Sequence, residues 1–356
     1  MSLTFCRRCL YSSAKPNLWM DDTGLCSACI YYDNQSKIDW SVRAQEFSIK
    51  CPPGMRVVVA CSGGKDSTYL VVRCKELGLH PIAVCATTDH LSDIGRRNLD
   101  NIGRLCDLIE VTTDKTLRRK MARYALETVG DISWCEHQTI WSIPARVAKG
   151  LDIPYVLYGE NPQNAYGAGP PDSAAAATMG QRWEAEFGGL NGLRLSDMKE
   201  QFPDGDFELY RMPVNPPERV FFGHFFEWDG YQNAVVAKMN GMEFYSRWVE
   251  GSACAWENLD NAQTGAHDHL RWLKFGYGRA TDIVSSQIRR GKMSREHAIE
   301  IVKERDGMFP WTYLGVPLED ILAPLGLSQT DFLGICQRFT NRTLFNDDGT
   351  PKFAVT

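Results

Sequence analysis

The sequence predicts an α/β protein built on a doubly wound parallel sheet. Short apolar runs rich in β-branched residues alternate with stretches of helical periodicity between residues 55 and 159. Two cysteine pairs precede this region, and helical patterns return toward the C-terminus. We therefore expect three regions: a cysteine module with a linker at 1–50, the α/β domain at 51–180, and a C-terminal region for substrate or partner contacts at 181–356.

Cysteine pairs open the chain. Cys6 and Cys9 form one CxxC pair, and Cys26 and Cys29 form a second pair sixteen residues later. Each pair can place two thiolates on one tetrahedral Zn²⁺, and a site with four protein ligands would be structural. Four unrelated buried cysteines, or an iron–sulfur cluster, are the alternatives.

The α/β region is predicted element by element. Strands are expected at residues 55–61, 81–86, 107–111 and 154–159, because each run is short and mostly apolar. Helices are expected at 66–77, where Gly78 provides the stop, and at 98–106 and 143–151. Later helices are predicted at 267–275, 294–305 and around 332–339, the last opened by a Ser328–Asp331 capping box. On such a sheet, ligands bind beyond the carboxyl ends of the strands.

Composition excludes several function classes. The chain of 356 residues is 44% hydrophobic and 23% charged, with a net charge of −5 and a pI of about 5.9. Nothing in this balance indicates a nucleic-acid partner. Neither an eighteen-residue apolar stretch nor an N-terminal signal pattern is evident. We expect a soluble, cytoplasmic protein with no membrane partner, which could form a homodimer.

An anion-binding loop joins the first strand to the first helix. Residues 62–67 read Ser-Gly-Gly-Lys-Asp-Ser, so backbone N–H groups and a helix dipole converge there. The glycines allow close approach to phosphate, Lys65 supplies charge, and Asp66 can hold Mg²⁺. A Walker loop needs four residues between its glycines, and this loop has none. The motif instead resembles the PP-loop of the ATP-pyrophosphatases, which cleave ATP between the α and β phosphates.

This resemblance implies a fold of the PP-loop type, with ATP and Mg²⁺ as cofactors. The family holds adenine near the end of its second strand, here residues 86–89. The expected nucleotide contacts are Ala60, Ser62, Gly63, Gly64, Lys65, Asp66, Ser67, Thr87, Asp89 and Gly159. Glu160, Asn161 and Gln163 follow the fourth strand and should lie at the same sheet edge.

The order of motifs resembles one family more specifically. The cysteine pairs, the phosphate loop, GENPQ at 159–163, ENLD at 257–260 and KFGYGRATD at 274–282 together look like the bacterial N-acetyl sugar amidotransferases, over residues 4–310. The resemblance implies conversion of an acetamido group on a nucleotide-linked sugar to an acetamidino group, for lipopolysaccharide O-antigen or nonulosonic acids. The expected catalytic residues are Lys65, Asp66, Glu160 and Arg279, the last as a bidentate phosphate clamp. The expected substrate contacts are Glu160, Asn161, Gln163, His137, Glu257 and Asp260.

One segment departs from that family. Its members carry a further CxxC-type cysteine pair at the positions of residues 130–137, where this chain keeps only Cys135 and His137. A role that needs two thiols there is therefore in doubt. His137 could instead act as an acid or base, or be purely structural.

Ammonia must come from outside the chain, because no glutaminase signature is evident. The resemblance implies a partner pair similar to the glutaminase and cyclase subunits of imidazole glycerol phosphate synthase. We also expect residues 166–171 and 174–177, rich in Gly, Pro and Ala, to close over the sugar nucleotide. A tRNA thiolase and an ATP-sensing regulator without enzymatic activity are the rival functions.

Overall fold

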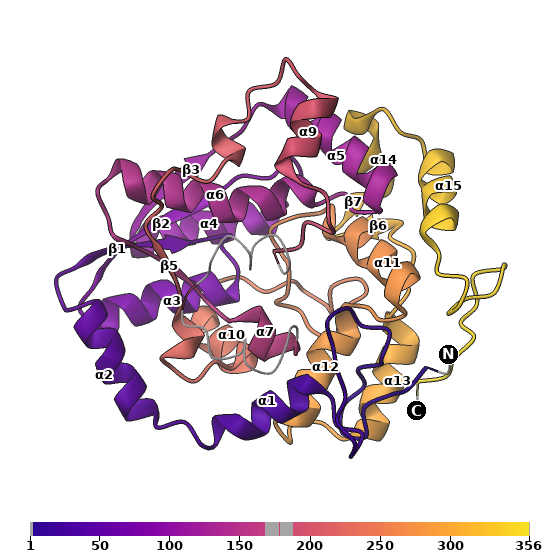
Figure 1. The fold of residues 1–356 in the computed structure, drawn as a ribbon, viewed down its shortest axis with the longest axis horizontal. Coiled ribbons are helices and arrows are strands. Elements are labelled where there is room, and N and C mark those ends of the chain that lie inside the picture. The colour runs from indigo at the N-terminus through magenta and orange to yellow at the C-terminus, as the bar shows by residue number, and fades with distance from the viewer. Residues whose placement is uncertain (1–2, 168–177, 179–187, 356) are drawn as a thin grey trace.

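A parallel sheet forms the centre of the protein, as the sequence predicts, and it contains a fifth strand beyond the four predicted. The computed structural model describes residues 3–167, 178 and 188–355, without the side chains of residues 163 and 164. The strands lie in the order β3-β2-β1-β4-β5 and all pair in parallel (Figure 1). Their bounds are β1 (Arg56–Ala60), β2 (His80–Ala86), β3 (Asp107–Val111), β4 (Tyr155–Tyr158) and β5 (Glu218–Phe221). The strand order reverses direction between β1 and β4, which is where α/β sheets of this kind bind ligands.

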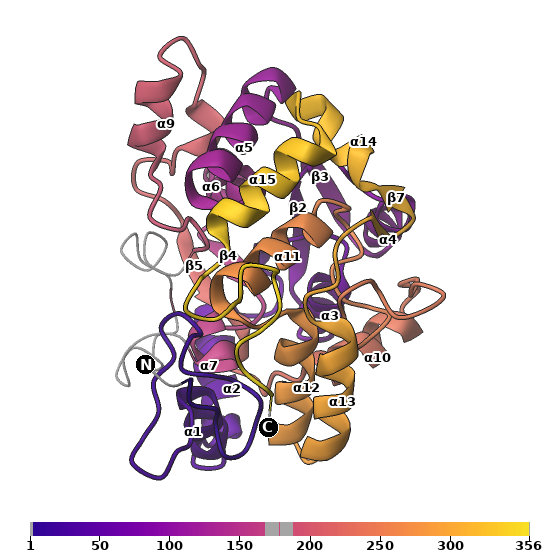
Figure 2. The same ribbon diagram turned by 90° about the vertical axis from the view of Figure 1, so that its right-hand side faces the viewer.

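Helices cover both faces of the sheet. Alternate residues along each strand point to opposite faces, so both sets of side chains are buried. Val57 and Val59 of β1 pack with α3 (Lys65–Glu76) in one buried cluster. Val58, between them, packs in a second cluster with α6 (Trp134–Gly150) on the other face. The same two layers are visible on either side of the sheet in Figure 2. This double burial explains why the strands read as continuous apolar runs.

Two of the predicted helices, α4 and α6, begin at least five residues before their predicted starts. α4 spans Asp93–Leu105 and is capped by Ser92, whose hydroxyl accepts from the Gly95 N–H at 2.9 Å. α6 begins at Trp134 and contains Pro144, which lies at the start of the predicted 143–151 helix. A proline inside a helix leaves the carbonyl four residues earlier without its donor. Here the Tyr158 hydroxyl donates to that carbonyl, on Ile140, at 3.0 Å, so the helix continues through the proline.

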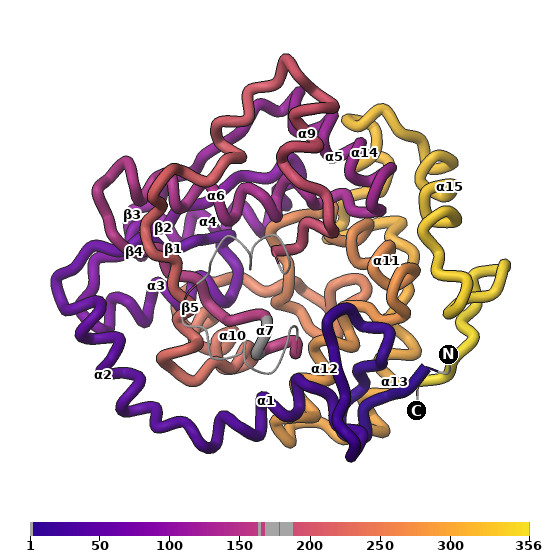
Figure 3. The backbone as a smooth tube through the Cα atoms, in the orientation of Figure 1, coloured from indigo at the N-terminus to yellow at the C-terminus, as the bar shows by residue number. Residues whose placement is uncertain are grey.

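Helices dominate the rest of the chain (Figure 3). The C-terminal helices predicted from periodicity are confirmed as α11 and α13, and the Ser328–Asp331 capping box opens α15. The sequence did not predict helices α1, α2, α5, α7, α9, α10, α12 and α14. The remaining bounds are α1 (Ser27–Gln35), α2 (Trp40–Lys50), α5 (Lys115–Val129), α7 (Pro162–Tyr166), α9 (Leu195–Gln201), α10 (Gly230–Met239), α11 (Thr264–Phe275), α12 (Arg279–Arg289), α13 (Arg295–Arg305), α14 (Leu318–Leu322) and α15 (Gln329–Phe339), with a small antiparallel pair of β6 (Thr312–Tyr313) and β7 (Val316–Pro317).

The division at residue 180 stays a prediction, although β5 lies beyond it and still belongs to the sheet. Of the expected mobile cover, only Tyr166 and Gly167 are described, and residues 168–171 and 174–177 lie outside the described residues. None of the described helices is long and apolar enough to cross a membrane.

Candidate functional site

The phosphate loop takes the geometry that its glycines predict. Gly63 has a φ of +83°, and a Cβ there would lie 3.0 Å from the Leu99 backbone nitrogen. A larger residue would therefore be strained and crowded at this position. Gly64 is the N-cap of α3 and offers no capping side chain. The first N–H groups of α3 consequently remain open to an anionic ligand.

Lys65 lies at the centre of a carboxylate cluster. Its side chain is buried, with Nζ 2.5 Å from Asp66 Oδ2 and 2.7 Å from Glu257 Oε1. Burial opposes the charge, but Asp66, Glu257 and Glu160 raise the pKa of Lys65 well above its ordinary value. Lys65 is therefore held as an ammonium ion within a mostly acidic environment.

Glu160 is the carboxylate most strongly affected by this cluster. Burial, followed by the nearby charge of Asp66, raises the pKa of Glu160 to about 7. Asp66 itself is oriented by Asn233 of α10, whose Nδ2 donates to Oδ1 at 2.8 Å. Three carboxylates face one ammonium, and their oxygen atoms are the ligands that Mg²⁺ prefers. The donor set therefore fits a divalent cation, which would relieve the repulsion among these carboxylates.

A pocket of about 1060 Å³, including the solvent at its mouth, opens over this cluster. Five parts of the chain contribute walls: the edge formed by the phosphate loop, the end of β4 and α7; helix α1; residues 223–231; residues 256–257; and α12 with Arg290. The lining includes Ala28, Tyr32, Gln35, Lys65, Asp66, Glu160, Asn161, Tyr166, Trp228, Tyr231, Trp256, Glu257, Arg279, Asp282, Ile283, Ser286, Gln287, Arg289 and Arg290.

Aromatic residues that the sequence did not single out surround this pocket. Trp228, Tyr231, Trp256 and Tyr166 all line it. Tyr231 and Trp256 meet edge to face, with ring centroids 5.9 Å apart. Aromatic surfaces of this kind suit sugar and base rings. These residues belong to segments without clear periodicity, so only the local density of aromatics could have indicated them.

Arg279 lines the pocket, but its guanidinium is already engaged. Nε and Nη2 donate to the two carboxylate oxygens of Asp268 at 3.0 and 2.9 Å. Burial opposes ionisation of Asp268, yet the charges of Arg279 and Arg271 lower its pKa to about 2. Arg279 therefore lies in the site already paired with Asp268, and its role as a phosphate clamp stays a prediction.

Several predicted contacts lie away from the lining of this pocket, as far as the described residues define it. Asp89 is buried against Arg118 and also lies 3.5 Å from Arg119. Thr87 bonds Thr112 through their hydroxyl groups at 2.9 Å. These interactions occupy the side chains that were expected to contact adenine.

The remaining predicted residues are distributed between other environments. Burial raises the pKa of Asp260 to about 6, and the Asp260 backbone packs against Gly95. His137 lies in a separate cluster, with Nδ1 3.0 Å from the Gly189 carbonyl and its ring 5.4 Å from that of His267. Gln163 belongs to α7, and its side chain lies outside the described residues.

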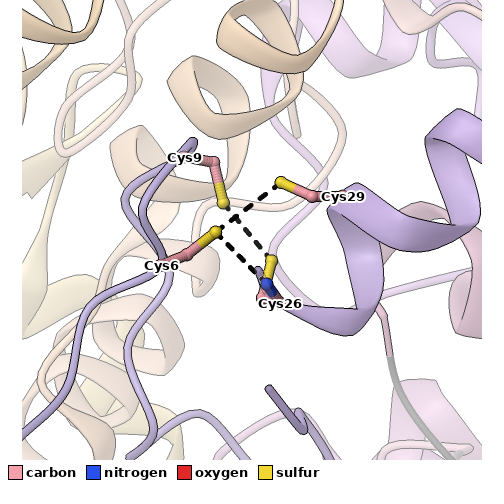
Figure 4. Close-up of side chains that lie close together, drawn as sticks. All are labelled: Cys6, Cys9, Cys26 and Cys29. Atoms are coloured by element: carbon pink, nitrogen blue, oxygen red, sulfur yellow. Dashed lines mark hydrogen bonds between the residues drawn. The ribbon is translucent and has the colours of Figure 1, made fainter. Parts of the chain in front are cut away.

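The cysteine pairs converge on one point (Figure 4). Cys6 and Cys9 approach from the N-terminal loop, while Cys26 and Cys29 lie at the start of α1. All four are buried free thiols, and their sulfur atoms lie within 4.8 Å of one another. Cys6 and Cys29 are 3.8 Å apart, and Cys9 and Cys26 are 3.5 Å apart. Tetrahedral Zn²⁺ with bonds of about 2.3 Å requires sulfur separations of about 3.8 Å, so the cluster fits a metal ion such as zinc.

The four thiols strongly perturb one another. Contacts with the Cys26 and Cys29 thiols lower the pKa of Cys6 and lower the pKa of Cys9 to about 7, whereas contacts within the same cluster, together with burial, raise the pKa values of Cys26 and Cys29. Metal binding requires deprotonated thiols, and a bound cation would offset the repulsion among four thiolates this close together.

The cysteine module is docked onto the pocket. The Tyr11 hydroxyl donates to Asp282 Oδ1 at 2.8 Å, and Asp282 lines the pocket. The Ser27 hydroxyl donates to the Gly167 carbonyl at 2.6 Å, just after α7. Both views in Figures 1 and 2 place the N-terminal segment beside α12. The module therefore forms part of the pocket and is not a detached appendage.

Comparison with known proteins finds a similarity in the C-terminal part of the chain. None of the curated proteins compared with it matches. Residues 243–355 match a protein family described as the C-terminal domain of LPS biosynthesis protein WbpG-like proteins. This segment includes Glu257 and all of α12, so it supplies a wall of the pocket. The chain is thus similar, over residues 243–355, to a domain of a lipopolysaccharide biosynthesis family.

Proposed function

We propose that this protein is an ATP-dependent amidotransferase that forms AMP and pyrophosphate and converts the acetamido group of a nucleotide-linked sugar to an acetamidino group. The observation that carries the proposal is that one pocket brings Lys65 and Asp66 of the phosphate loop together with Glu257, which belongs to the segment similar to the WbpG-like domain, residues 243–355. A nucleotide-activating loop and a domain type found in lipopolysaccharide biosynthesis thus face the same ligand space. Both reactants would be cytoplasmic.

In the first step, the amide carbonyl oxygen attacks the α-phosphorus of ATP. An O–P bond forms, the bond between the α-phosphorus and the bridging oxygen breaks, and pyrophosphate leaves with that electron pair. Lys65 and the open N–H groups of α3 stabilise the charge on the phosphates. Mg²⁺, held by Asp66 and Glu257, would neutralise phosphate oxygens and favour departure of pyrophosphate. The product is an O-adenylyl imidate.

In the second step, ammonia adds to the imidate carbon. The carbon–oxygen bond then breaks, AMP leaves with the electron pair, and the sugar retains an amidine. The nitrogen derived from ammonia must lose a proton during this step. Glu160 lines the pocket, and its pKa of about 7 suits a general base at neutral pH. Ammonia itself would come from a separate glutaminase and cyclase-like pair.

The reaction can be tested with the isolated full-length chain. With ATP, Mg²⁺, a UDP-linked acetamido sugar and ammonium at alkaline pH, AMP and pyrophosphate should appear in equal amounts, and only when the sugar is present. Glutamine should not replace ammonium without the partner proteins. The Asp66→Asn variant should lose turnover, while Asp100→Asn, on the exposed side of α4, should retain it.

Other product patterns would contradict the proposal. ADP and phosphate would indicate ordinary phosphoryl transfer. Turnover that requires tRNA would favour the thiolase. Nucleotide binding with no pyrophosphate under any of these conditions would favour the regulator.

A further inference from the structure

One face of α12 lines the pocket along its whole length. Arg279, Ile283 and Ser286 lie on that face, together with Arg290 just after the helix. Ala280 and Val284 point away and are buried with residues of α13. A helix with one packed face normally turns its polar face to solvent. In this helix the polar face is turned into a ligand space.

Arg289 at the end of α12 has an unmet hydrogen-bonding group. Its side chain is 9% exposed and lines the pocket. Nη2 donates to the Ala165 carbonyl at 3.1 Å, and the guanidinium lies 5.3 Å from the centre of the Tyr11 ring. Nη1 is buried and has no hydrogen-bond partner among the residues that the structure describes. A buried charged donor without an acceptor is costly, so an acceptor is expected when the site is in use.

Charge balance distinguishes Arg289 from the other pocket cations. Lys65 pairs with Asp66 and Glu257, as described above, and Arg279 pairs with Asp268. Arg290 lies 3.4 Å from Asp229. Within the described ranges, by contrast, no carboxylate lies within the 4.0 Å ion-pair distance of Arg289. The positive charge of Arg289 therefore remains available to an anionic ligand.

We propose that Arg289 is a second anion-binding position in the pocket, separate from the loop at residues 62–67, and that it binds the diphosphate of the nucleotide-linked substrate. The identity of that ligand rests on the proposed function. A guanidinium can present two N–H groups to phosphate oxygens, and a diphosphate diester carries one negative charge on each phosphate. The loop at residues 62–67 then binds the phosphates of ATP, while Arg289 binds the diphosphate of the nucleotide-linked sugar. Both anions can be bound at once.

The cysteine module offers a competing role for Arg289. Its guanidinium is affected by the charges of Cys9, Cys26 and Cys29 as well as by Tyr11. Four thiolates around a divalent metal ion carry a net negative charge, which Arg289 could balance without contacting substrate. A test must therefore separate diphosphate binding from support of the metal centre.

The control comes from a second arginine that contacts the same module. Arg295 of α13 donates through Nη1 to the Arg8 carbonyl at 3.1 Å and also to the Cys9 carbonyl. It does not belong to the described pocket lining. Replacing Arg295 therefore disturbs the support of the cysteine module without removing a pocket cation.

The experiment is calorimetric titration of the zinc-loaded full-length protein with UDP, with and without saturating α,β-methylene-ATP. We expect UDP to bind in both cases, because the two anion positions are distinct. Arg289→Gln should weaken UDP binding by about tenfold or more, with unchanged affinity for the ATP analogue and unchanged zinc content. Arg289→Lys should show a smaller loss, and Arg295→Gln should bind UDP like the wild type.

Three outcomes would overturn the inference. These are failure of the wild type to bind UDP, competition between UDP and the ATP analogue, and Arg289→Gln with normal UDP affinity. Loss of zinc in both Arg289→Gln and Arg295→Gln with equally weakened UDP binding would assign Arg289 to the metal centre instead. Release of AMP and pyrophosphate by the wild type is measured separately. The proposed reaction can therefore stand while this inference fails, or fail while it stands.

Discussion

Replacement of Glu160 by glutamine should stabilise the folded protein, and should do so mainly at alkaline pH. The pKa of Glu160 is raised from 4.5 to about 7, so the folded state favours the protonated acid. The stability contributed by this proton is fully present below about pH 4.5 and is lost as the pH rises through 7. The difference in pKa corresponds to at most about 3 kcal/mol of the free energy of unfolding, because the side chain still contacts solvent in the pocket.

Thermal unfolding provides the assay. For a chain of 356 residues, about 3 kcal/mol corresponds to an increase of about 4 °C in Tm. The gain for Glu160→Gln should approach this value at about pH 8.5 and fall to about a quarter of it near pH 5. Glu300→Gln, at a side chain that is 80% exposed, should change Tm by less than about 1 °C at either pH. An equal gain at both pH values, or no gain at pH 8.5, would refute the argument that burial and Asp66 repel the charge on Glu160.

Three further substitutions test other parts of the structure. Combined Cys9→Ser and Cys26→Ser should remove one equivalent of zinc in elemental analysis while circular dichroism retains the α/β signal; a wild type without metal would contradict the assignment. Arg118→Gln should leave the buried Asp89 carboxylate with only the longer, 3.5 Å contact to the exposed Arg119, lowering the free energy of unfolding by about 3 kcal/mol; an unchanged Tm would show that water or Arg119 compensates for the lost arginine. Gly95→Ala should cost about 1–3 kcal/mol, because the new Cβ would lie 2.7 Å from the Asp260 backbone; wild-type stability would mean that α4 shifts freely.

The buried strands could be predicted because burial on both faces leaves an apolar run for each. β2, predicted at 81–86, spans His80–Ala86 and has five consecutive buried residues. β5 was missed because it contains only four residues, including Glu218 and Arg219, and follows a long irregular segment. The first half of α6 was missed for a tertiary reason. The helix predicted at 143–151 begins beside Pro144, and only the fold shows that Tyr158 donates the hydrogen bond that lets α6 extend through this proline.

The candidate site was predictable where residues are close in sequence. The loop containing Lys65 and Asp66 lies at the carboxyl edge of β1, beside Glu160, as expected for a parallel sheet. Residues brought in by tertiary packing were not predictable, among them Asn233, which orients Asp66, and Arg289. Some residues predicted for the site instead pair with residues that are distant in the sequence. Asp89, for example, pairs with an arginine of α5 rather than lying in the pocket lining.

The central claim is that an acetamido oxygen is activated by adenylation and replaced by nitrogen, and mass spectrometry of the sugar product tests it most directly. The reaction should be run with ATP, Mg²⁺, a UDP-linked acetamido sugar and heavy-nitrogen ammonium. The account predicts a product in which one oxygen is replaced by an NH group that carries the heavy isotope, formed together with equimolar AMP. An unchanged sugar in the presence of AMP release, or a product that gains sulfur or phosphate in place of nitrogen, would contradict it.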